Sequence, residues 1–231
     1  MKHAPVAVVT GSSHGIGPDI VRALRVAGYA VVSNGRSPDK GPGDVHVRAD
    51  VSTDSGARRV IAAARKLGGL DVLVCGVGDF SMTPVSRMNL KAWDDLFESN
   101  LRTAWVCCRE GLPLLRRSAG VILTIGGSAT NSVRANPRYV AYQMAKTALT
   151  VFTKSLAQSE APTGVRVNMI NPGIIRTPDN DGPLLRKLVR RVPAGRAGAP
   201  RDIAQAVVWL ASDTASYITG AVLDVGGGLW M

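Results

Sequence analysis

The sequence has few cysteines and no long apolar run. Its three cysteines, Cys75, Cys107 and Cys108, are too few for a disulfide framework, and no Cys or His cluster has metal-ligand spacing. No apolar stretch approaches the roughly 18 residues of a membrane span. The apolar run Val6–Val9 leads into a glycine-rich turn and not into a signal-peptide cleavage site. These absences predict a cytoplasmic protein with reduced thiols and with no structural metal or membrane segment.

Acidic residues are scarce relative to basic ones. The chain has 17 Asp and Glu against 28 Lys and Arg, which gives a formal net charge of +11. The arginines are spread along the chain, so a general compositional bias explains the charge more simply than one dedicated anionic surface does. NADP phosphates, a carrier protein or a coenzyme A ester stay open as anionic partners. No nucleic-acid-binding module is recognisable, so nucleic acid is not an expected partner.

Short β-branched runs alternate with longer amphipathic stretches along the whole chain. This alternation predicts an α/β domain with a mostly parallel sheet and right-handed crossovers. Continuous apolar runs are typical of strands that are covered on both faces. No repeat or long linker divides the chain, so one domain is expected over residues 1–231. Strands are expected at 6–9, 30–33, 45–47, 72–74, 121–125, 165–170 and 222–225, and helices at 16–27, 55–67, 90–117, 138–160, 184–191 and 201–211.

A glycine-rich turn joins the first expected strand to the first expected helix. The segment Thr10–Gly17 has the spacing Gly-x3-Gly-x-Gly. Gly11 permits a tight turn, Gly15 lets the backbone approach a pyrophosphate, and Gly17 lets the helix pack closely on the strand. The helix N-terminus then offers free N–H groups to the phosphates. This strand–turn–helix context predicts a dinucleotide site.

The end of the second expected strand indicates which dinucleotide binds. An NAD enzyme usually carries a carboxylate there for the ribose diol, but this chain has Ser33-Asn34-Gly35-Arg36. Arg36 can pair with a 2′-phosphate through charge-assisted hydrogen bonds. The segment therefore favours NADP(H) over NAD(H).

Tyr142 and Lys146 form the strongest chemical signal. Positions i and i+4 of a helix lie on one face, about one turn apart. An ammonium group beside a phenol favours the phenolate, so the tyrosine pKa is expected to fall toward the working pH. Tyr142 can then give a proton to a carbonyl oxygen or take one from an alcohol.

The glycine spacing, the Tyr-x3-Lys pair and the C-terminal segments 195–204 and 217–228 resemble those of the short-chain dehydrogenase/reductase family. The resemblance runs from end to end and is greatest to β-ketoacyl carrier-protein reductases and related ketoreductases. It implies a doubly wound Rossmann-type fold, with a seven-stranded parallel sheet and helices on both faces. Beyond the glycines and Arg36, it implies cofactor contacts from Ser13, His14, Ile16, Asp50, Val51, Gly76, Tyr142, Lys146, Pro172, Gly173, Ile175 and Thr177.

Three catalytic roles follow from the same resemblance. Lys146 would hold the nicotinamide ribose, and Asn100 would hold a water that links the lysine to solvent. The usual serine would stabilise the substrate oxygen. Counting back from Tyr142 places that serine at Ala129, whereas the strand alignment places it at Gly127. Ser128, between the two, is the best candidate, and Ser132 is the fallback.

The segment Cys75–Gly78 departs from the family, which often has Asn-Asn-Ala-Gly there. Gly76 and Gly78 keep the close backbone approach, but the amide side chains that brace the sheet are missing. This departure and the displaced serine leave room for a non-redox NADP(H)-binding protein as one alternative.

The sequence thus predicts an NADP(H)-dependent ketoreductase that acts on a 3-oxoacyl thioester or another ketone. Enoyl-thioester reduction through Tyr139, seven residues before Lys146, is the second alternative. A lid is expected at about 178–192, and its basic side chains could guide a carrier-protein or coenzyme A substrate. By analogy with relatives, the chain would form a homotetramer or homodimer.

Overall fold

A computed structural model describes residues 4–37, 41–127, 130 and 135–229. Within these ranges the chain forms one sheet of seven parallel strands in the order β3-β2-β1-β4-β5-β6-β7. The doubly wound α/β fold and the seven predicted strands are confirmed. The strands are β1 (Val6–Thr10), β2 (Ala30–Gly35), β3 (Val45–Arg48), β4 (Val72–Cys75), β5 (Val121–Ile125), β6 (Arg166–Pro172) and β7 (Val222–Val225).

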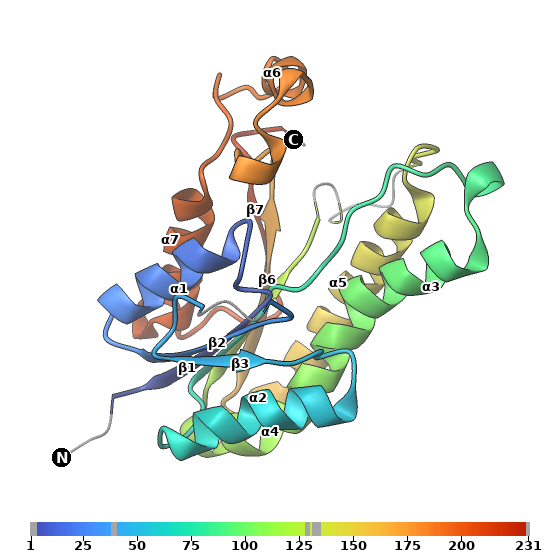
Figure 1. Cartoon of the computed structure of the whole chain (residues 1–231). Helices are drawn as coiled ribbons and strands as arrows, with labels where there is room; N and C mark the ends of the chain where they lie inside the picture. The colour runs from blue at the N-terminus through green and yellow to red at the C-terminus, as the bar shows by residue number, and fades with distance from the viewer. Residues whose placement is uncertain (1–3, 38–40, 128–129, 131–134, 230–231) are drawn as a thin grey trace.

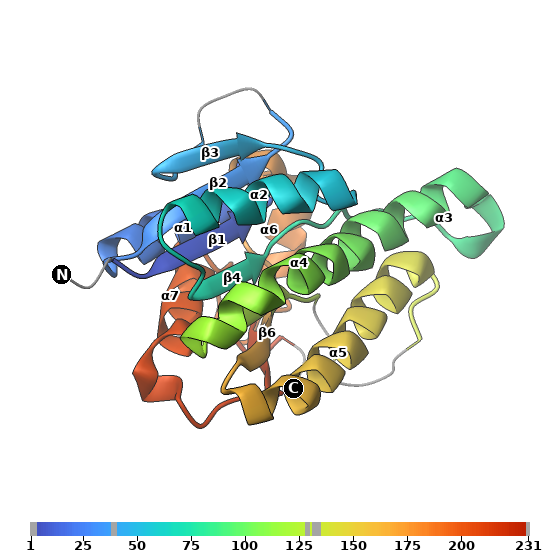
Figure 2. The same ribbon diagram turned by 90° about the horizontal axis from the view of Figure 1, so that it is seen from below.

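Helices cover both faces of this sheet. On one face α1 packs against α7, and on the other α2 packs against α4, with α5 beside α4 (Figures 1 and 2). Helix α6 lies apart, above the carboxyl end of the sheet (Figure 1). The helices are α1 (Gly17–Val26), α2 (Asp54–Lys66), α3 (Leu90–Phe97), α4 (Thr103–Ser118), α5 (Val140–Glu160), α6 (Pro183–Val189) and α7 (Pro200–Ala211).

Two separate apolar layers stabilise the sheet, one on each face. One contains Ile20, Leu24 and Ile203, and the other contains Leu73, Leu115 and Ile122, all almost completely buried. The central strands β1, β4 and β5 are buried along their whole length. Apolar residues on both strand faces therefore explain the continuous runs in the sequence.

The helix expected over 90–117 is not continuous. A π-helical turn, Glu98–Arg102, separates α3 from α4 and buries Ser99 and Asn100. The wider π turn changes the direction in which successive side chains point, and such turns are frequent at functional sites. The amphipathic pattern did not reveal this interruption, because the period of a single turn differs too little from 3.6.

The connection order places a crevice at the carboxyl edge of the sheet. The chain leaves β1 toward β2 and β3 on one side, and continues through β4 on the other. Ligands of open α/β sheets bind outside the carboxyl ends of strands at this point of reversal. In the described part of the chain, no helix is long and apolar enough to cross a membrane.

Candidate functional site

The glycine turn after β1 adopts a backbone that other residues resist. Gly11 and Gly15 have φ of 65° and 62°, in the left-handed region that favours glycine. A Cβ on Gly11 would lie 2.8 Å from the Gly76 carbonyl oxygen, and one on Gly17 would lie 2.5 Å from the Gly11 carbonyl oxygen. The space around Gly15 is open to 4 Å. The turn thus packs tightly on its inner side and exposes backbone on its outer side.

A cavity of about 490 Å³ lies against this turn. The hydroxyl of Ser13 is buried beside it with no hydrogen-bond partner. A Cβ on Gly35 would collide with that hydroxyl, so Gly35 keeps the space beside it free. An unpartnered buried hydroxyl is costly unless a ligand satisfies it, so the cavity fits the phosphates of a dinucleotide. Its lining includes most of the residues predicted for the adenosine half of a cofactor: Gly11, Ser13, His14, Arg36, Asp50, Val51 and Gly76.

A second cavity, of about 520 Å³, shares Arg36 and Asp50 with the first and adds Arg48 and Arg59. The Arg48 Nε donates a hydrogen bond of 3.1 Å to the Arg36 carbonyl oxygen. Hydrogen bonds from Ser52, helped by the charge of Arg36, lower the pKa of the Asp50 carboxyl below its usual value. Within the described ranges, none of the three arginines forms an ion pair with a carboxylate. Their charges are therefore available to an anion.

Sequence reasoning missed Arg48 and Arg59. The signal for Arg48 is the strand register, because parallel pairing sets Arg48 opposite Gly35, the residue before Arg36. Arg59 lies on α2, three positions after Gly56, whose absent side chain lets the helix approach the Asp50 carbonyl. Neither relation can be read from spacing along the chain.

Tyr142, Lys146 and Asn100 converge at the carboxyl ends of β4 and β5. A Cβ on Gly78 would lie 2.6 Å from the Asn100 Oδ1 and 3.0 Å from the Lys146 Nζ, so both groups face one point. A Cβ on Gly127 would lie 2.8 Å from the Tyr142 hydroxyl. The turn after β5 thus packs directly against the phenol.

Hydrogen bonds fix two of these side chains. The Lys146 Nζ donates to the Ile125 carbonyl oxygen at 2.8 Å and lies 6.0 Å from the centre of the Tyr142 ring. The Asn100 Nδ2 donates to the carbonyl oxygens of Asp79 and Leu96, at 2.8 and 3.0 Å. The Asn100 Oδ1 is buried without a partner. It can accept a hydrogen bond from a water held between it and the lysine.

The expected fall in the Tyr142 pKa is not found. Burial, together with the nearby Tyr139, raises the Tyr142 pKa to about 12. Burial also lowers the Lys146 pKa to about 8, and the charge of Asp79 partly offsets that shift. Because the site removes both groups from water, desolvation of the charged form is the largest cause of each shift. At neutral pH Tyr142 is therefore a proton donor, and Lys146 carries its charge close to its titration point.

The predicted serine cannot be placed. Ser128 and the fallback Ser132 both lie outside the described residues, as does Ala129. Thr130, between them, donates to the Gly127 carbonyl oxygen at 3.2 Å and to the Asn171 Oδ1 at 3.1 Å. Its hydroxyl therefore connects the ends of β5 and β6.

The turn after β6 was predicted to contact the nicotinamide. A Cβ on Gly173 would lie 2.5 Å from the Gly226 Cα, so the turn packs on the segment after β7. The Ile175 side chain lies in the core, with 7% of its surface exposed, and its carbonyl oxygen accepts a hydrogen bond from the Asn180 Nδ2 at 2.8 Å. Thr177 and Asn180 cap the short turn Pro178–Asn180 with reciprocal hydrogen bonds. Pro172 is half-buried at the end of β6.

Known proteins share both this architecture and this sequence. A family model described as enoyl-(acyl carrier protein) reductase matches residues 11–230. The 3beta-hydroxysteroid dehydrogenase 1 of Eggerthella lenta is 34% identical, over 96% of this chain and 92% of the relative. The 3-oxoacyl-[acyl-carrier-protein] reductase FabG of Vibrio cholerae is 35% identical, over 98% and 97%. The solved 3-ketoacyl-(acyl-carrier-protein) reductase of Brucella melitensis, complexed with NADH, superposes with a TM-score of 0.88 at 29% identity, over 98% of both chains.

Fold and sequence together define an oxidoreductase built on a dinucleotide-binding sheet. The chain belongs to the short-chain dehydrogenase/reductase family and is similar to its ketoacyl reductases.

Proposed function

We propose that this protein is an NADP(H)-dependent carbonyl reductase that converts a ketone to a secondary alcohol. The observation that carries the proposal is the convergence of the Tyr142 hydroxyl, the Lys146 Nζ and the Asn100 Oδ1 on the turns after β4 and β5. The ketone and hydroxyl substrates in the names of its relatives support this reaction. A nicotinamide cofactor, when bound, supplies the hydride.

Tyr142 acts as the general acid. Its high pKa keeps the phenol protonated at neutral pH, as a donor to a carbonyl oxygen requires. The turn after β5 would hold that oxygen against the phenol, and Ser128, if its hydroxyl reaches the same point, would stabilise the developing charge.

Lys146 and Asn100 serve the tyrosine in two ways. As a cation, Lys146 stabilises the tyrosinate left after proton transfer, and it is also the proposed ligand of the nicotinamide ribose. Asn100, through a water at its free Oδ1, would return the proton from solvent. The reverse oxidation of an alcohol uses the same groups in the opposite order.

NADP(H) is the proposed cofactor because three arginines line the cavity beside Asp50, and none of them pairs with a carboxylate among the described residues. The 2′-phosphate of NADP(H) would lie in that cavity, at the place where NAD enzymes use a carboxylate to bind the free ribose diol. Arg36 and Arg48 would form charge-assisted hydrogen bonds with it, and Arg59 would add to the positive potential.

A binding titration of NADPH against NADH tests this cofactor assignment. We expect Arg48→Ala and Arg36→Ala each to weaken NADPH binding about tenfold or more, since a hydrogen bond to a charged group contributes about 1.5–3 kcal/mol. NADH binding should change by less than about twofold. Arg58→Ala is the matched control, because Arg58 precedes Arg59 on α2 but pairs with Asp54. Equal loss of both cofactors, or a preference of the unaltered protein for NADH, would contradict the assignment.

Enoyl reduction through Tyr139 is the alternative that agrees with the description of the family model, enoyl-(acyl carrier protein) reductase. The relatives cited above act, by name, on ketone or hydroxyl groups, which supports Tyr142. A non-redox protein would bind NADPH and reduce no ketone or β-ketoacyl thioester in a broad panel. Turnover of any such substrate excludes it.

We further propose that the segment 178–192 closes over the substrate. Arg186, Lys187 and Arg190 are exposed there, which suits an anionic carrier or a coenzyme A group.

The exposed Trp105 on α4 and Met144 on α5 support the proposed homo-oligomer, and light scattering after size-exclusion chromatography measures its size.

A further inference from the structure

Phe80 stands out among the exposed apolar side chains because it touches the proposed acid. It follows β4 by five residues, and 58% of its surface is exposed. Its ring meets Tyr142 edge-on, with centroids 4.9 Å apart at 88°, and meets Tyr139 at 5.6 Å and 61°. The two tyrosine rings are 6.2 Å apart at 73°. These three residues form an aromatic cluster from two separate segments of the chain.

The position of Phe80 is set by the same residue that serves the proposed proton relay. The Asn100 Nδ2 holds the carbonyl oxygen of Asp79, the preceding residue, at 2.8 Å. On the other side, the hydroxyls of Ser81 and Thr83 are 2.7 Å apart and close the loop on itself. Phe80 is therefore held on a braced loop next to Tyr142, and such preorganisation favours a binding role.

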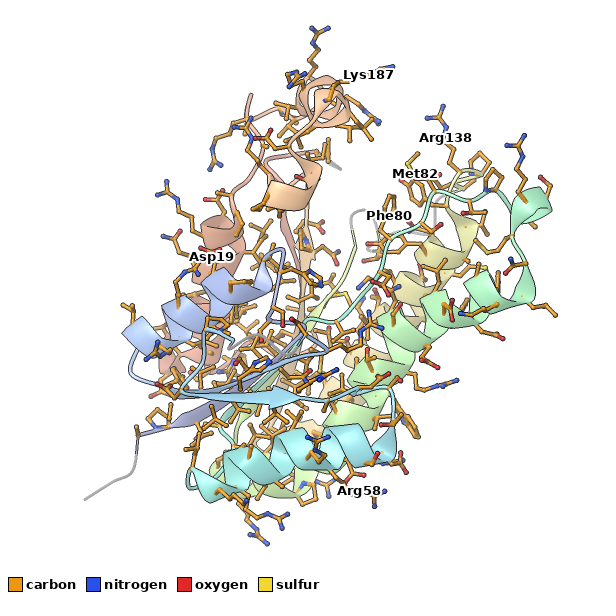
Figure 3. The ribbon with its side chains drawn as sticks, viewed as in Figure 1. Asp19, Arg58, Phe80, Met82, Arg138 and Lys187 are labelled. Carbon is orange, nitrogen blue, oxygen red and sulfur yellow. The ribbon has the colours of Figure 1, made fainter. Side chains whose placement is uncertain are left out.

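The uncovered part of the cluster is apolar. Met82, on the same loop, has 50% of its surface exposed. Figure 3 shows Phe80 and Met82 together beside the N-terminal part of α5, across the upper part of the molecule from Lys187 on α6. A carbonyl oxygen that accepts the Tyr142 proton brings the groups on its carbon against these side chains.

Ring geometry indicates which substituent fits best. Aromatic rings favour partners at centroid distances of 4.5–7 Å in edge-on or offset arrangements, and the cluster already uses this spacing. A rigid ring also loses less conformational freedom on binding than a flexible acyl chain does. A polyol would leave its hydroxyl groups unpaired against Phe80 and Met82.

We propose that Phe80 and Tyr139 form a substrate-binding wall that selects ketones with an apolar ring beside the carbonyl group. This proposal rests on the proposed carbonyl reduction and specifies its substrate class. Phe80 is the specificity residue, because Tyr139 shares its ring contacts with the proposed acid.

Steady-state NADPH oxidation with two probes tests the proposal. 1-Tetralone carries the ring, and the N-acetylcysteamine thioester of acetoacetate represents a flexible acyl chain. Phe80→Ala should lower kcat/KM for 1-tetralone about tenfold, mainly through KM, since the variant loses both the aromatic pair with the substrate ring and the apolar area that the pair buries. The thioester value should change by less than about twofold. Phe80→Leu should fall between, and Val85→Ala, on the same loop without a ring contact to Tyr142, should match the unaltered protein.

Two results would contradict the proposal that Phe80 and Tyr139 form a substrate-binding wall. One is an equal loss on both probes in Phe80→Leu, with normal NADPH affinity, which would indicate general damage to the site. The other is a higher kcat/KM for the thioester than for 1-tetralone in the unaltered protein. If no ketone is turned over, the proposed function fails, but quenching of NADPH fluorescence by 1-tetralone still measures binding. Quenching that Phe80→Ala does not weaken then rejects the wall as well.

Discussion

Replacement of Tyr142 by Phe should lower kcat for ketone reduction by about 10³-fold, within the 10²–10⁴ range of general acid catalysis. The substitution removes one hydroxyl and keeps the ring, so the contact with Phe80 and the packing of α5 should persist. NADPH affinity should stay within about threefold. Stopped-flow single-turnover kinetics with 1-tetralone measure the chemical step directly.

Tyr139→Phe is the matched control for this experiment. Tyr139 also packs on Phe80, but it precedes the first residue of α5. We expect its removal to change kcat by less than about threefold on ketones, because the ring wall is kept. If Tyr139→Phe alone abolishes ketone turnover, the acid has been assigned to the wrong tyrosine.

Lys146→Met should lower kcat for ketone reduction about as much as Tyr142→Phe does. It should also change how the free energy of unfolding depends on pH. Burial lowers the Lys146 pKa from 10.5 to about 8, so the folded protein holds this charge at a cost of about 3 kcal/mol at pH 7. Met removes that cost but leaves the Ile125 carbonyl without its partner, which costs about 1–3 kcal/mol. The two proteins should therefore be about equally stable at pH 7.

The difference should appear as the pH rises. Between pH 8 and about 10.5 the unfolded chain binds more protons at this position than the folded chain does, so the unaltered protein gains stability with pH. It should gain about 2–3 kcal/mol over the Met variant by pH 10. Urea denaturation of both proteins at pH 7 and pH 10 measures this gain.

Lys154→Met provides the control, since Lys154 is exposed on the same helix and its removal should leave the pH dependence unchanged. A constant stability difference between Lys146→Met and the unaltered protein at both pH values would show that Lys146 is not a desolvated cation. The deprotonation of Lys146 also predicts that kcat/KM for reduction falls tenfold per pH unit above about pH 8, as the lysine loses its charge.

The sequence was informative wherever a local pattern carries the information. The glycine turn could be predicted, because Gly11 and Gly15 occupy positive φ angles that few other residues adopt. Tyr142 and Lys146 could be placed on one face of α5, because four residues make about one helical turn. The seven strands followed from apolar runs that only a sheet covered on both sides requires.

Other features of the site depended on contacts between distant segments. The break between α3 and α4 arises where Asn100 must turn inward to reach the Asp79 carbonyl. Arg48 joins Arg36 through the register of β2 with β3. Phe80 looked like an ordinary loop residue until α5 brought both tyrosines beside it.

The sequence by itself therefore determined the fold and named the candidate groups for the chemistry, since backbone periodicity and glycine geometry are local properties. Only the tertiary structure decided the protonation of those groups. Spacing alone predicted that Lys146 lowers the Tyr142 pKa, but the opposite shifts prevail, with Tyr142 near 12 and Lys146 near 8. Desolvation depends on everything that excludes water from a side chain, and the segments that do so here come from β4, β5 and α5 together.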